Sequence, residues 1–301
     1  MENHLSISQY EDTYPKNVNL NNYAFRYAYI RSSDSRNYDD PGQDYLSFSS
    51  DDNTFIFVIC DGVSQSFFGD LGAKLLGNGL IEWLQSMNNE FESGKLQASL
   101  SNYLVKFTAT SKEYIDHYPL PENVSPILHD VLEKKRGHGS ESTFVCGRID
   151  FPSESFADGR IFLGWMGDTR LRIWRDSVEC TNELEGDFDT KKRWSSNKGL
   201  VGGDPYVFIS DLGNMDRRNH ITKILAYSDG LSSLDHFYEY ITNKRLLDLL
   251  VESMESPTSD DISYIEIFLN VTDQNKNMYE KNEDTKNLRT ASIDVPTQPR
   301  K

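Results

Sequence analysis

The sequence predicts a fold of the α+β class, because many short apolar runs typical of strands accompany only a few helical patterns. The runs typical of strands lie at 23–30, 44–48, 55–60, 144–149, 161–166, 171–174, 221–227 and 262–269. Apolar residues spaced three or four apart at 71–87 and 96–114 predict two helices, which we expect to cover one face of a sheet as an antiparallel pair. Neither an internal repeat nor a linker between two cores is visible, so the 301 residues suit one large domain.

The chain begins with a polar segment, 1–22, which we expect to fray as an extension outside the domain. The aromatic residues of 23–30 favour a strand. The next segment, 32–43, is rich in Asp, Ser and Asn and contains Pro41-Gly42, so it predicts a loop.

The strand at 55–60 has six apolar residues in succession, which is typical of a strand buried on both faces. The turn residues Asp51-Asp52-Asn53 precede it and predict a hairpin with the strand at 44–48.

The helix predicted at 71–87 has Asp70 as a plausible N-cap. Three glycines inside it lower its helical propensity, and we expect them to allow close packing against a sheet. These glycines are Gly72, Gly77 and Gly79.

The middle of the chain alternates between strands and segments without a clear period. The segment 119–139 is polar and poorly patterned, so it predicts no regular element. The runs at 161–166 and 171–174 predict a hairpin, and the span 181–203 predicts a long surface loop.

The C-terminal part contains a short helical pattern at 245–254 and a last strand at 262–269. Residues 271–301 have almost no apolar side chains and are dense in polar residues, so we expect a disordered tail. The chain therefore divides into an extension at 1–22, a domain at 23–270 and a tail at 271–301.

The formal net charge of −16 argues against a nucleic acid or an anionic membrane as the partner, because both need a basic surface. A substrate that carries phosphate would have to be attracted by a local positive charge, such as metal ions.

Three cysteines without paired spacing, Cys60, Cys146 and Cys180, suggest reduced thiols. Cys60 and Cys146 lie in apolar runs and are expected in the core. The start of the chain has no signal-peptide pattern and no apolar run is long enough to span a membrane, so we expect a cytoplasmic protein.

Acidic residues stand at the ends of four predicted strands. They belong to the pairs Asp61-Gly62, Gly167-Asp168, Asp229-Gly230 and Asp260-Asp261. One Asp-Gly pair is usually only a turn. Several carboxylates at one edge of a sheet would repel each other unless cations lay between them. Carboxylates, a backbone carbonyl and water are the ligands that Mg²⁺ and Mn²⁺ prefer, and two such ions can activate a water and bind a phosphoryl group.

The sequence lacks the motifs of several other chemistries, including GxGxxG, the P-loop, HExxH, paired CxxC and GxSxG. No nucleophilic side chain with a base beside it is apparent. A water activated by metal ions is therefore the expected nucleophile.

Six short motifs resemble, in their residues and in their order along the chain, those of the type 2C metal-dependent serine/threonine protein phosphatases (the PPM family), in particular of their bacterial branch. The motifs are Gln43-Asp44, Asp61-Gly62, Gly139-Ser140-Glu141-Ser142-Thr143, Gly167-Asp168-Thr169-Arg170, Ser228-Asp229-Gly230 and Asp260-Asp261-Ile262-Ser263. Each is weak alone, but all six occur in family order at or beside predicted strand ends. The resemblance implies a four-layer α-β-β-α sandwich of two antiparallel sheets flanked by helix pairs.

The resemblance also implies the ligands of two Mg²⁺ or Mn²⁺ ions. Asp61 would bridge both ions and the carbonyl of Gly62 would bind the second. Asp229 and Asp260 would complete the shell of the first.

Two further aspartates have implied roles around these ions. Asp44 would orient water on the metals from the second coordination shell. Asp168, together with Asp229, would hold a third and weaker ion.

The chain departs from the family pattern in three places. Val63-Ser64-Gln65-Ser66 follows Asp61-Gly62, where the family has a histidine proposed as general acid. The family's phosphate-binding arginine is replaced by Asp39, so Arg36 or Arg31 would have to bind phosphate, or each is a solvated surface residue. Gln43 replaces the more familiar Glu.

The function expected from these features is hydrolysis of phospho-Ser and phospho-Thr by a metal-bridging water. The expected partner is a phosphoprotein, either a target of a Ser/Thr kinase or the kinase itself. The alternative is a non-catalytic pseudophosphatase that binds a kinase or a signalling partner. A calcium-binding structural module fits less well, because no EF-hand loop is present.

Two other groups carry an open interpretation. His138 lies between two glycines and fits a loop residue better than a ligand. The basic group Lys191-Lys192-Arg193 is either a solvated part of a loop or a docking site for a phosphopeptide.

Overall fold

The computed structural model describes most of the chain. The described residues are 3–20, 23–51, 53–87, 93–122, 124–153, 158–212, 220–237, 241–256 and 258–269. The predicted tail at 271–301 lies outside them, and the division of the chain into extension, domain and tail stays a prediction.

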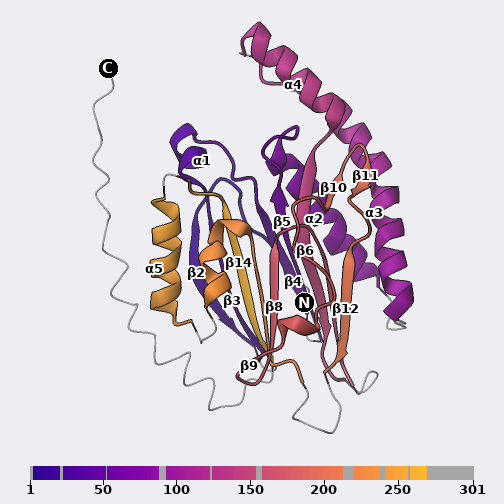
Figure 1. Ribbon diagram of the computed structural model, residues 1–301, viewed down its shortest axis with the longest axis vertical. Coiled ribbons are helices and arrows are strands. Elements are labelled where there is room, and N and C mark those ends of the chain that lie inside the picture. Colours follow the sequence, from indigo (N-terminus) through magenta and orange to yellow (C-terminus); the bar gives the residue numbers. More distant parts are fainter. Residues whose placement is uncertain are drawn as a thin grey trace.

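Two antiparallel sheets pack face to face, with helices on the outer face of each (Figure 1). The α+β class and the four-layer arrangement are thus confirmed. Within the described residues no helix is both long and apolar enough to cross a membrane.

The first sheet is built around strand β5, which has β4 on one side and β6 on the other. The sheet consists of β1 (Asn3–Ser6), β4 (Tyr45–Ser50), β5 (Thr54–Gly62), β6 (Glu141–Asp150), β7 (Arg160–Met166), β10 (Arg193–Ser195), β11 (Gly199–Val201) and β12 (Tyr206–Asp211). The pairing of β4 with β5 confirms the predicted hairpin.

The second sheet is built around β14, which lies between β3 and β13. In spatial order its strands are β2 (Thr13–Asn19), β3 (Tyr23–Ile30), β14 (Ile262–Leu269), β13 (Lys223–Tyr227), β8 (Arg170–Arg175) and β9 (Val178–Glu179).

The alternation of side chains along β5 shows why a continuous apolar run is needed there. Phe55, Phe57 and Ile59 belong to the core between the sheets. Val58 and Cys60 belong to the core beneath the outer helices. Successive residues of a strand point to opposite faces, so a strand covered on both faces must be apolar at every position.

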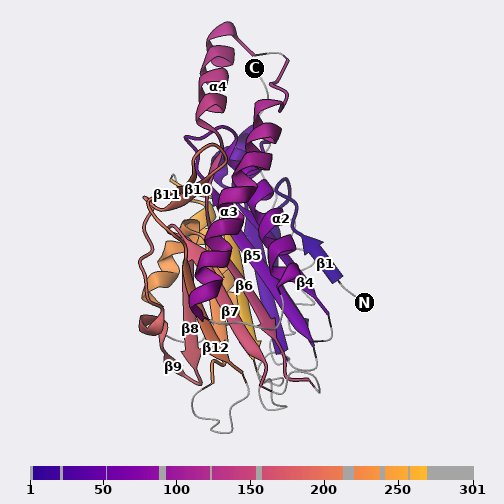
Figure 2. The ribbon, with the colours of Figure 1, turned by 90° about the vertical axis from the view of Figure 1, so that its right-hand side faces the viewer.

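Helices cover both outer faces (Figures 1 and 2). On the first sheet they are α2 (Gly69–Ser86) and α3 (Ser93–Asp116). On the second sheet they are α5 (Asn243–Met254) and the 3₁₀-helix η3 (Asp229–His236).

The glycines of α2 allow the close packing that the sequence predicts. A Cβ at residue 77 would overlap the ring of Tyr45, and a Cβ at residue 72 would lie 2.8 Å from the Cβ of Ser140. A Cβ at residue 79 would lie 2.7 Å from the ring of Phe107 in α3. The helix propensity lost at these positions is therefore the cost of bringing α2 close to its neighbours.

Three sequence-based expectations in the first part of the chain differ from the structure. Residues 1–22 do not simply fray, because β1 pairs with β4 and β2 pairs with β3. The loop at 32–43 contains a short helix, α1 (Ser33–Tyr38), whose N-cap is Ser32. Asp70 is not the N-cap of α2, because it lies inside the helix. The helix begins at Gly69, and its N-cap is Phe68, whose backbone is in the left-handed conformation.

The segment 119–139 contains a helix, α4 (Pro126–His138), that the sequence pattern did not predict. None of its residues is buried, so no apolar stripe marks it. Local signals still define the helix, since Ser125 caps its N-terminus and Pro126 occupies its first turn.

The predicted hairpin of 161–166 with 171–174 is wrong, because β7 and β8 belong to different sheets. The chain crosses between the sheets at residues 167–169. In the first sheet β7 pairs with β12, and in the second sheet β8 pairs with β13. The span 181–203 is also more regular than a loop, since it contains the 3₁₀-helix η1 (Thr181–Glu183) and the strands β10 and β11.

Candidate metal centre

The acidic strand ends meet at one end of the sandwich, the end from which α4 projects (Figure 1). In the first sheet, Asp44 immediately precedes β4 and Asp61 lies near the end of β5. In the second sheet, Asp229 follows β13 and Asp260 precedes β14. Asp168 lies on the crossing between the sheets. Antiparallel pairing alone places these residues at the same end of each sheet.

The carboxylates are close enough to change one another's ionisation. Burial raises the pKa of Asp61 well above its usual value, and the negative charges of Asp44, Asp229, Asp260 and Asp168 raise it further. The Asp61 side chain itself is partly accessible to solvent at this end of the fold.

Asp229 shows the same effect to a smaller degree. Burial raises its pKa to about 6, with contributions from the charges of Asp260 and Asp168. A hydrogen bond with Asp61 and the positive charge of Arg170 act in the opposite direction. The strand register and these charge effects both put the five aspartates that the sequence singles out at the same end of the sandwich.

Asp44 is 2% exposed, and its Oδ2 atom has no hydrogen-bond partner among the described residues. Burial, followed by the charge of Asp261, raises its pKa well above the usual value, while a hydrogen bond with Ser228 lowers it. A buried carboxylate oxygen without a partner is costly unless a cation or an ordered water satisfies it.

The role of Asp261, the second residue of the Asp260-Asp261 pair, was not predicted from the sequence. Its two carboxylate oxygens accept hydrogen bonds of 2.7 Å from the backbone N–H groups of Ser32 and Gln43. Asp261 therefore holds the end of β3 and the start of β4 against the start of β14. The signal that could have identified it is a second aspartate directly before an apolar strand. A carboxylate buried at that position needs hydrogen-bond donors to offset the loss of water.

Glycines let the backbone segments of this end approach closely. The N–H of Gly62 donates to the carbonyl of Gln43 at 3.2 Å. A Cβ at residue 62 would overlap the backbone of Gly69, and a Cβ at residue 230 would overlap the carbonyl of Asp261. The glycines of the two Asp-Gly pairs are thus required by packing as well as by turn formation.

The position of Asp168 is set by its neighbours on the crossing segment. The hydroxyl of Thr169 bonds to that of Thr143 at 2.9 Å. Arg170 donates to the carbonyl of Asp168 and pairs with Asp235 at 3.2 Å. The Gly-Ser-x-x-Thr and Gly-Asp-x-Arg motifs therefore form one connected unit.

The two candidate phosphate-binding arginines have different surroundings. Arg36 donates to the backbone carbonyls of Ser32 and Met254, so its guanidinium fastens α1 to the end of α5. Arg31 pairs with Asp12 at 3.5 Å, and its side chain lies beside Gly42 next to Asp261. Arg31 also donates to the carbonyl of Asp40 at 3.3 Å, so both arginines have partners within the chain.

No histidine occupies the loop that follows Asp61-Gly62. His138 lies at the exposed end of α4, where its Nδ1 atom contacts the carbonyl of Lys134 at 2.8 Å. The basic group of the later loop is engaged in part, since Arg193 pairs with Glu141 at 2.5 Å and Lys192 donates to the hydroxyl of Tyr206 at 2.6 Å.

The five aspartates offer only carboxylate oxygen, which is the kind of donor that a hard divalent cation prefers. Within the described ranges, however, no three His, Cys, Asp or Glu side chains are already arranged as a metal site. The unpartnered Oδ2 atom of the buried Asp44 is the polar atom at this end that a cation or an ordered water would satisfy. The individual ligand roles stay predictions.

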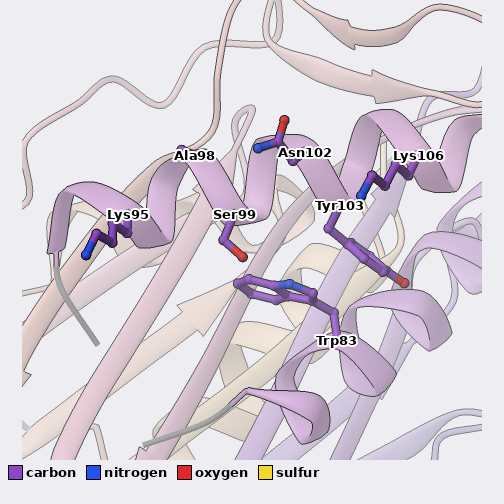
Figure 3. A pocket seen from close by; sticks show the side chains of 7 residues that line it. All are labelled: Trp83, Lys95, Ala98, Ser99, Asn102, Tyr103 and Lys106. Atoms are coloured by element: carbon purple, nitrogen blue, oxygen red, sulfur yellow. The ribbon is translucent and has the colours of Figure 1, made fainter. Parts of the chain in front are cut away.

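A groove elsewhere on the surface does not overlap this centre. It lies between α2 and α3 and is lined by side chains that include Trp83, Lys95, Tyr103 and Lys106 (Figure 3). None of the clustered aspartates contributes to it.

Comparisons with known proteins agree on the fold. No family model matches the sequence, and no curated protein matches it either. Solved structures do match, and the chain has the fold of the bacterial type 2C serine/threonine phosphatases.

Three of the matching structures illustrate the likeness. The phosphatase Stp1 from Staphylococcus aureus is 15% identical, with a TM-score of 0.52 over 81% of this chain and 94% of its own. A bacterial serine phosphatase is also 15% identical, with a TM-score of 0.52 over 83% of this chain and 98% of its own. RsbX in complex with magnesium is 12% identical, with a TM-score of 0.52 over 85% of this chain and 99% of its own.

Proposed function

We propose that this chain is a metal-dependent phosphoprotein phosphatase that hydrolyses phospho-Ser and phospho-Thr. The proposal is supported by the position of Asp44, Asp61, Asp168, Asp229 and Asp260 at one end of a sandwich that has the fold of the type 2C phosphatases.

Asp61, Asp229 and Asp260, with the carbonyl of Gly62, would hold two Mg²⁺ or Mn²⁺ ions, and Asp168 would contribute to a third. Bound ions of this kind activate a water and neutralise the charge of a phosphoryl group. The magnesium complex of RsbX supports the choice of cation.

The remaining groups would position the reactants. Asp44 is fixed by its burial and by Ser228, so it can accept a hydrogen bond from the attacking water. The guanidinium of Arg31 would bind the phosphate oxygens after leaving Asp12. No histidine is placed to protonate the leaving group, so a solvent molecule would do so.

A pseudophosphatase is the second candidate, and the observations that favour it are Asp39 at the position of the family's arginine and the missing histidine. Its partner would be a kinase or another signalling protein. The retention of every acidic position favours the enzyme, since a binding module gains nothing from burying several like charges. A cytoplasmic location is part of the same proposal.

The test is turnover of p-nitrophenyl phosphate with Mn²⁺ and with excess EDTA, together with calorimetric measurement of Mn²⁺ binding. We expect Mn²⁺-dependent turnover that Asp61→Asn reduces to background, with loss of Mn²⁺ binding. The exposed Asp248 of α5 supplies a matched control, Asp248→Asn, that should retain both. Wild-type Mn²⁺ binding without turnover would favour the pseudophosphatase, and near-wild-type turnover by Asp61→Asn would refute the site.

A further inference from the structure

Helix α4 projects from the sandwich beyond the end that carries the aspartates (Figures 1 and 2). All of its residues are exposed or half-buried. Three apolar side chains near its tip are unusually exposed, with Ile127 at 79%, Leu128 at 45% and Val131 at 45%. Clustered apolar side chains that contribute nothing to a core mark a surface for a partner.

The base of α4 is held firmly beside the candidate metal centre. Arg136 lies 5.3 Å over the ring of Phe67 and donates to the carbonyl of Tyr118 at 2.6 Å. Lys135 donates to the carbonyl of Ser64 at 3.3 Å, two residues beyond Gly62. A macromolecule that reaches the aspartates from this side would therefore meet the helix.

Several basic side chains gather at the base of α4, where the acidic Glu133 is paired with Arg136 at 3.0 Å. Lys134 is exposed on the last turns of α4, next to the half-buried Lys135. The exposed Lys198 is close by, because its neighbour Asn197 donates to the carbonyl of Gly137 at 3.1 Å. In a chain of net charge −16, a basic rim beside the metal centre favours an acidic partner.

We propose that α4 is a docking arm for the phosphoprotein substrate. Its apolar tip contacts an apolar part of the substrate protein, and the basic rim at its base contacts acidic residues around the phosphorylated side chain. The proposal rests on the proposed function, since it assigns the arm to the same reaction. It implies that the arm affects protein substrates and leaves small phosphoesters unaffected, because only a large substrate spans both surfaces.

The experiment compares wild type with the tip variant Ile127→Ser/Leu128→Ser/Val131→Ser. The matched control is Val105→Ser/Val178→Ser. It removes two apolar side chains outside α4, Val105 of α3, which is 55% exposed, and Val178 of β9, which is 67% exposed. The probes are p-nitrophenyl phosphate, phosphorylated α-casein and a ten-residue phosphopeptide from the same casein. We expect the tip variant to lower kcat/KM on the casein about tenfold and to leave the other two probes unchanged.

A second variant, Lys134→Glu, tests the basic rim. We expect it to lower kcat/KM on both the casein and the phosphopeptide about threefold, while p-nitrophenyl phosphate turnover is unchanged. Circular dichroism of each variant checks that α4 is retained.

Binding of the casein in the presence of EDTA separates this proposal from the proposed function. If wild type binds the casein and the tip variant does not, the arm is confirmed even where no turnover occurs. Equal binding and equal casein turnover by the two proteins would overturn it. A wild-type dimer that the tip variant converts to a monomer in analytical ultracentrifugation would also overturn it, because the tip would then contact a second copy of this chain.

Discussion

At the scale of single residues, the aspartate cluster opposes the stability of the metal-free fold. Burial and mutual repulsion raise the pKa values of Asp44, Asp61, Asp229 and Asp261. Each raised value means that the ionised side chain is less favourable in the folded chain than in the unfolded chain. Asp61 and Asp229 are also two of the proposed cation ligands, so stability would be given up where the chemistry is proposed.

Asp44→Asn removes a buried charge while keeping the shape of the side chain. We expect the metal-free variant to be more stable than wild type by about 1 kcal/mol, which corresponds to roughly 2–4 °C in Tm. Mn²⁺-dependent turnover should fall about 10- to 100-fold, because the carboxylate no longer orients the attacking water. Thermal unfolding in EDTA and p-nitrophenyl phosphate assays measure the two effects. A metal-free variant less stable than wild type would contradict the account of Asp44.

The stability of the metal-free protein should depend on pH in a defined direction. Asp229 has a pKa of about 6 in the folded chain and an ordinary value near 4 in the unfolded chain. Between about pH 4 and pH 6 the folded chain binds more protons at this group than the unfolded chain does. The contribution of Asp229 to stability is therefore greatest below about pH 4 and is lost as the pH rises through about 6. The raised pKa values of Asp44 and Asp61 act in the same direction.

The measurement is urea unfolding in EDTA at pH 5 and pH 8, where we expect a loss on the order of 1 kcal/mol at the higher pH. Saturating Mn²⁺ should cancel the trend, because ionised carboxylates bind the cation. A pH-independent midpoint in EDTA would show that the aspartates do not interact as described.

At the scale of elements, the glycines of α2 and α4 have opposite roles. Gly77 faces the ring of Tyr45, with no room for a Cβ. Gly137 lies in α4, with no neighbouring atom within 4 Å of the position of a Cβ. The same substitution should therefore have opposite effects at the two sites.

Gly77→Ala should destabilise the protein by about 1–3 kcal/mol through overpacking against β4. Gly137→Ala should be neutral or stabilising by up to about 1 kcal/mol, because alanine favours the helix. Urea unfolding of the two variants, measured side by side, checks both. Equal effects would mean that α2 is not packed closely on the sheet.

At the scale of the whole molecule, the two sheets are joined differently at their two ends. At the end away from the aspartates, aromatic rings interlock, with Tyr23 stacked on Phe151 at 4.6 Å and Phe25 lying 4.8 Å from Phe55. At the other end, carboxylates from both sheets face each other. Cations at that end would therefore connect the sheets.

Mn²⁺ should stabilise both sheets together, as a ligand that binds only the folded state does. At a concentration 100 times its Kd, the ion adds about 2.7 kcal/mol, or roughly 5–10 °C in Tm. Tryptophan fluorescence and circular dichroism should give the same shift in wild type and in Trp174→Phe, which removes the tryptophan of the second sheet. A shift confined to one signal would show that the ion contacts a single sheet.

The sequence predicted most of the strands and the chemistry of their ends. Strands β3 and β14 were predicted to the residue, because their apolar and aromatic runs record burial that is local to each strand. The acidic residues were identified because several carboxylates at the ends of buried strands are costly unless their charge is compensated. The exposed helix α4 was missed for the converse reason, since a helix that buries nothing leaves no period in the sequence.

The sequence by itself therefore determined the α+β class, the buried central strand and the identity of the acidic side chains, since these follow from local patterns of polarity. Only the tertiary structure decided that β7 and β8 lie in different sheets, that Asp261 ties three segments together, and that α4 stands beside the aspartates. Each of these depends on contacts between residues far apart in the chain, and local periodicity carries no record of which distant segment a strand or a side chain will meet.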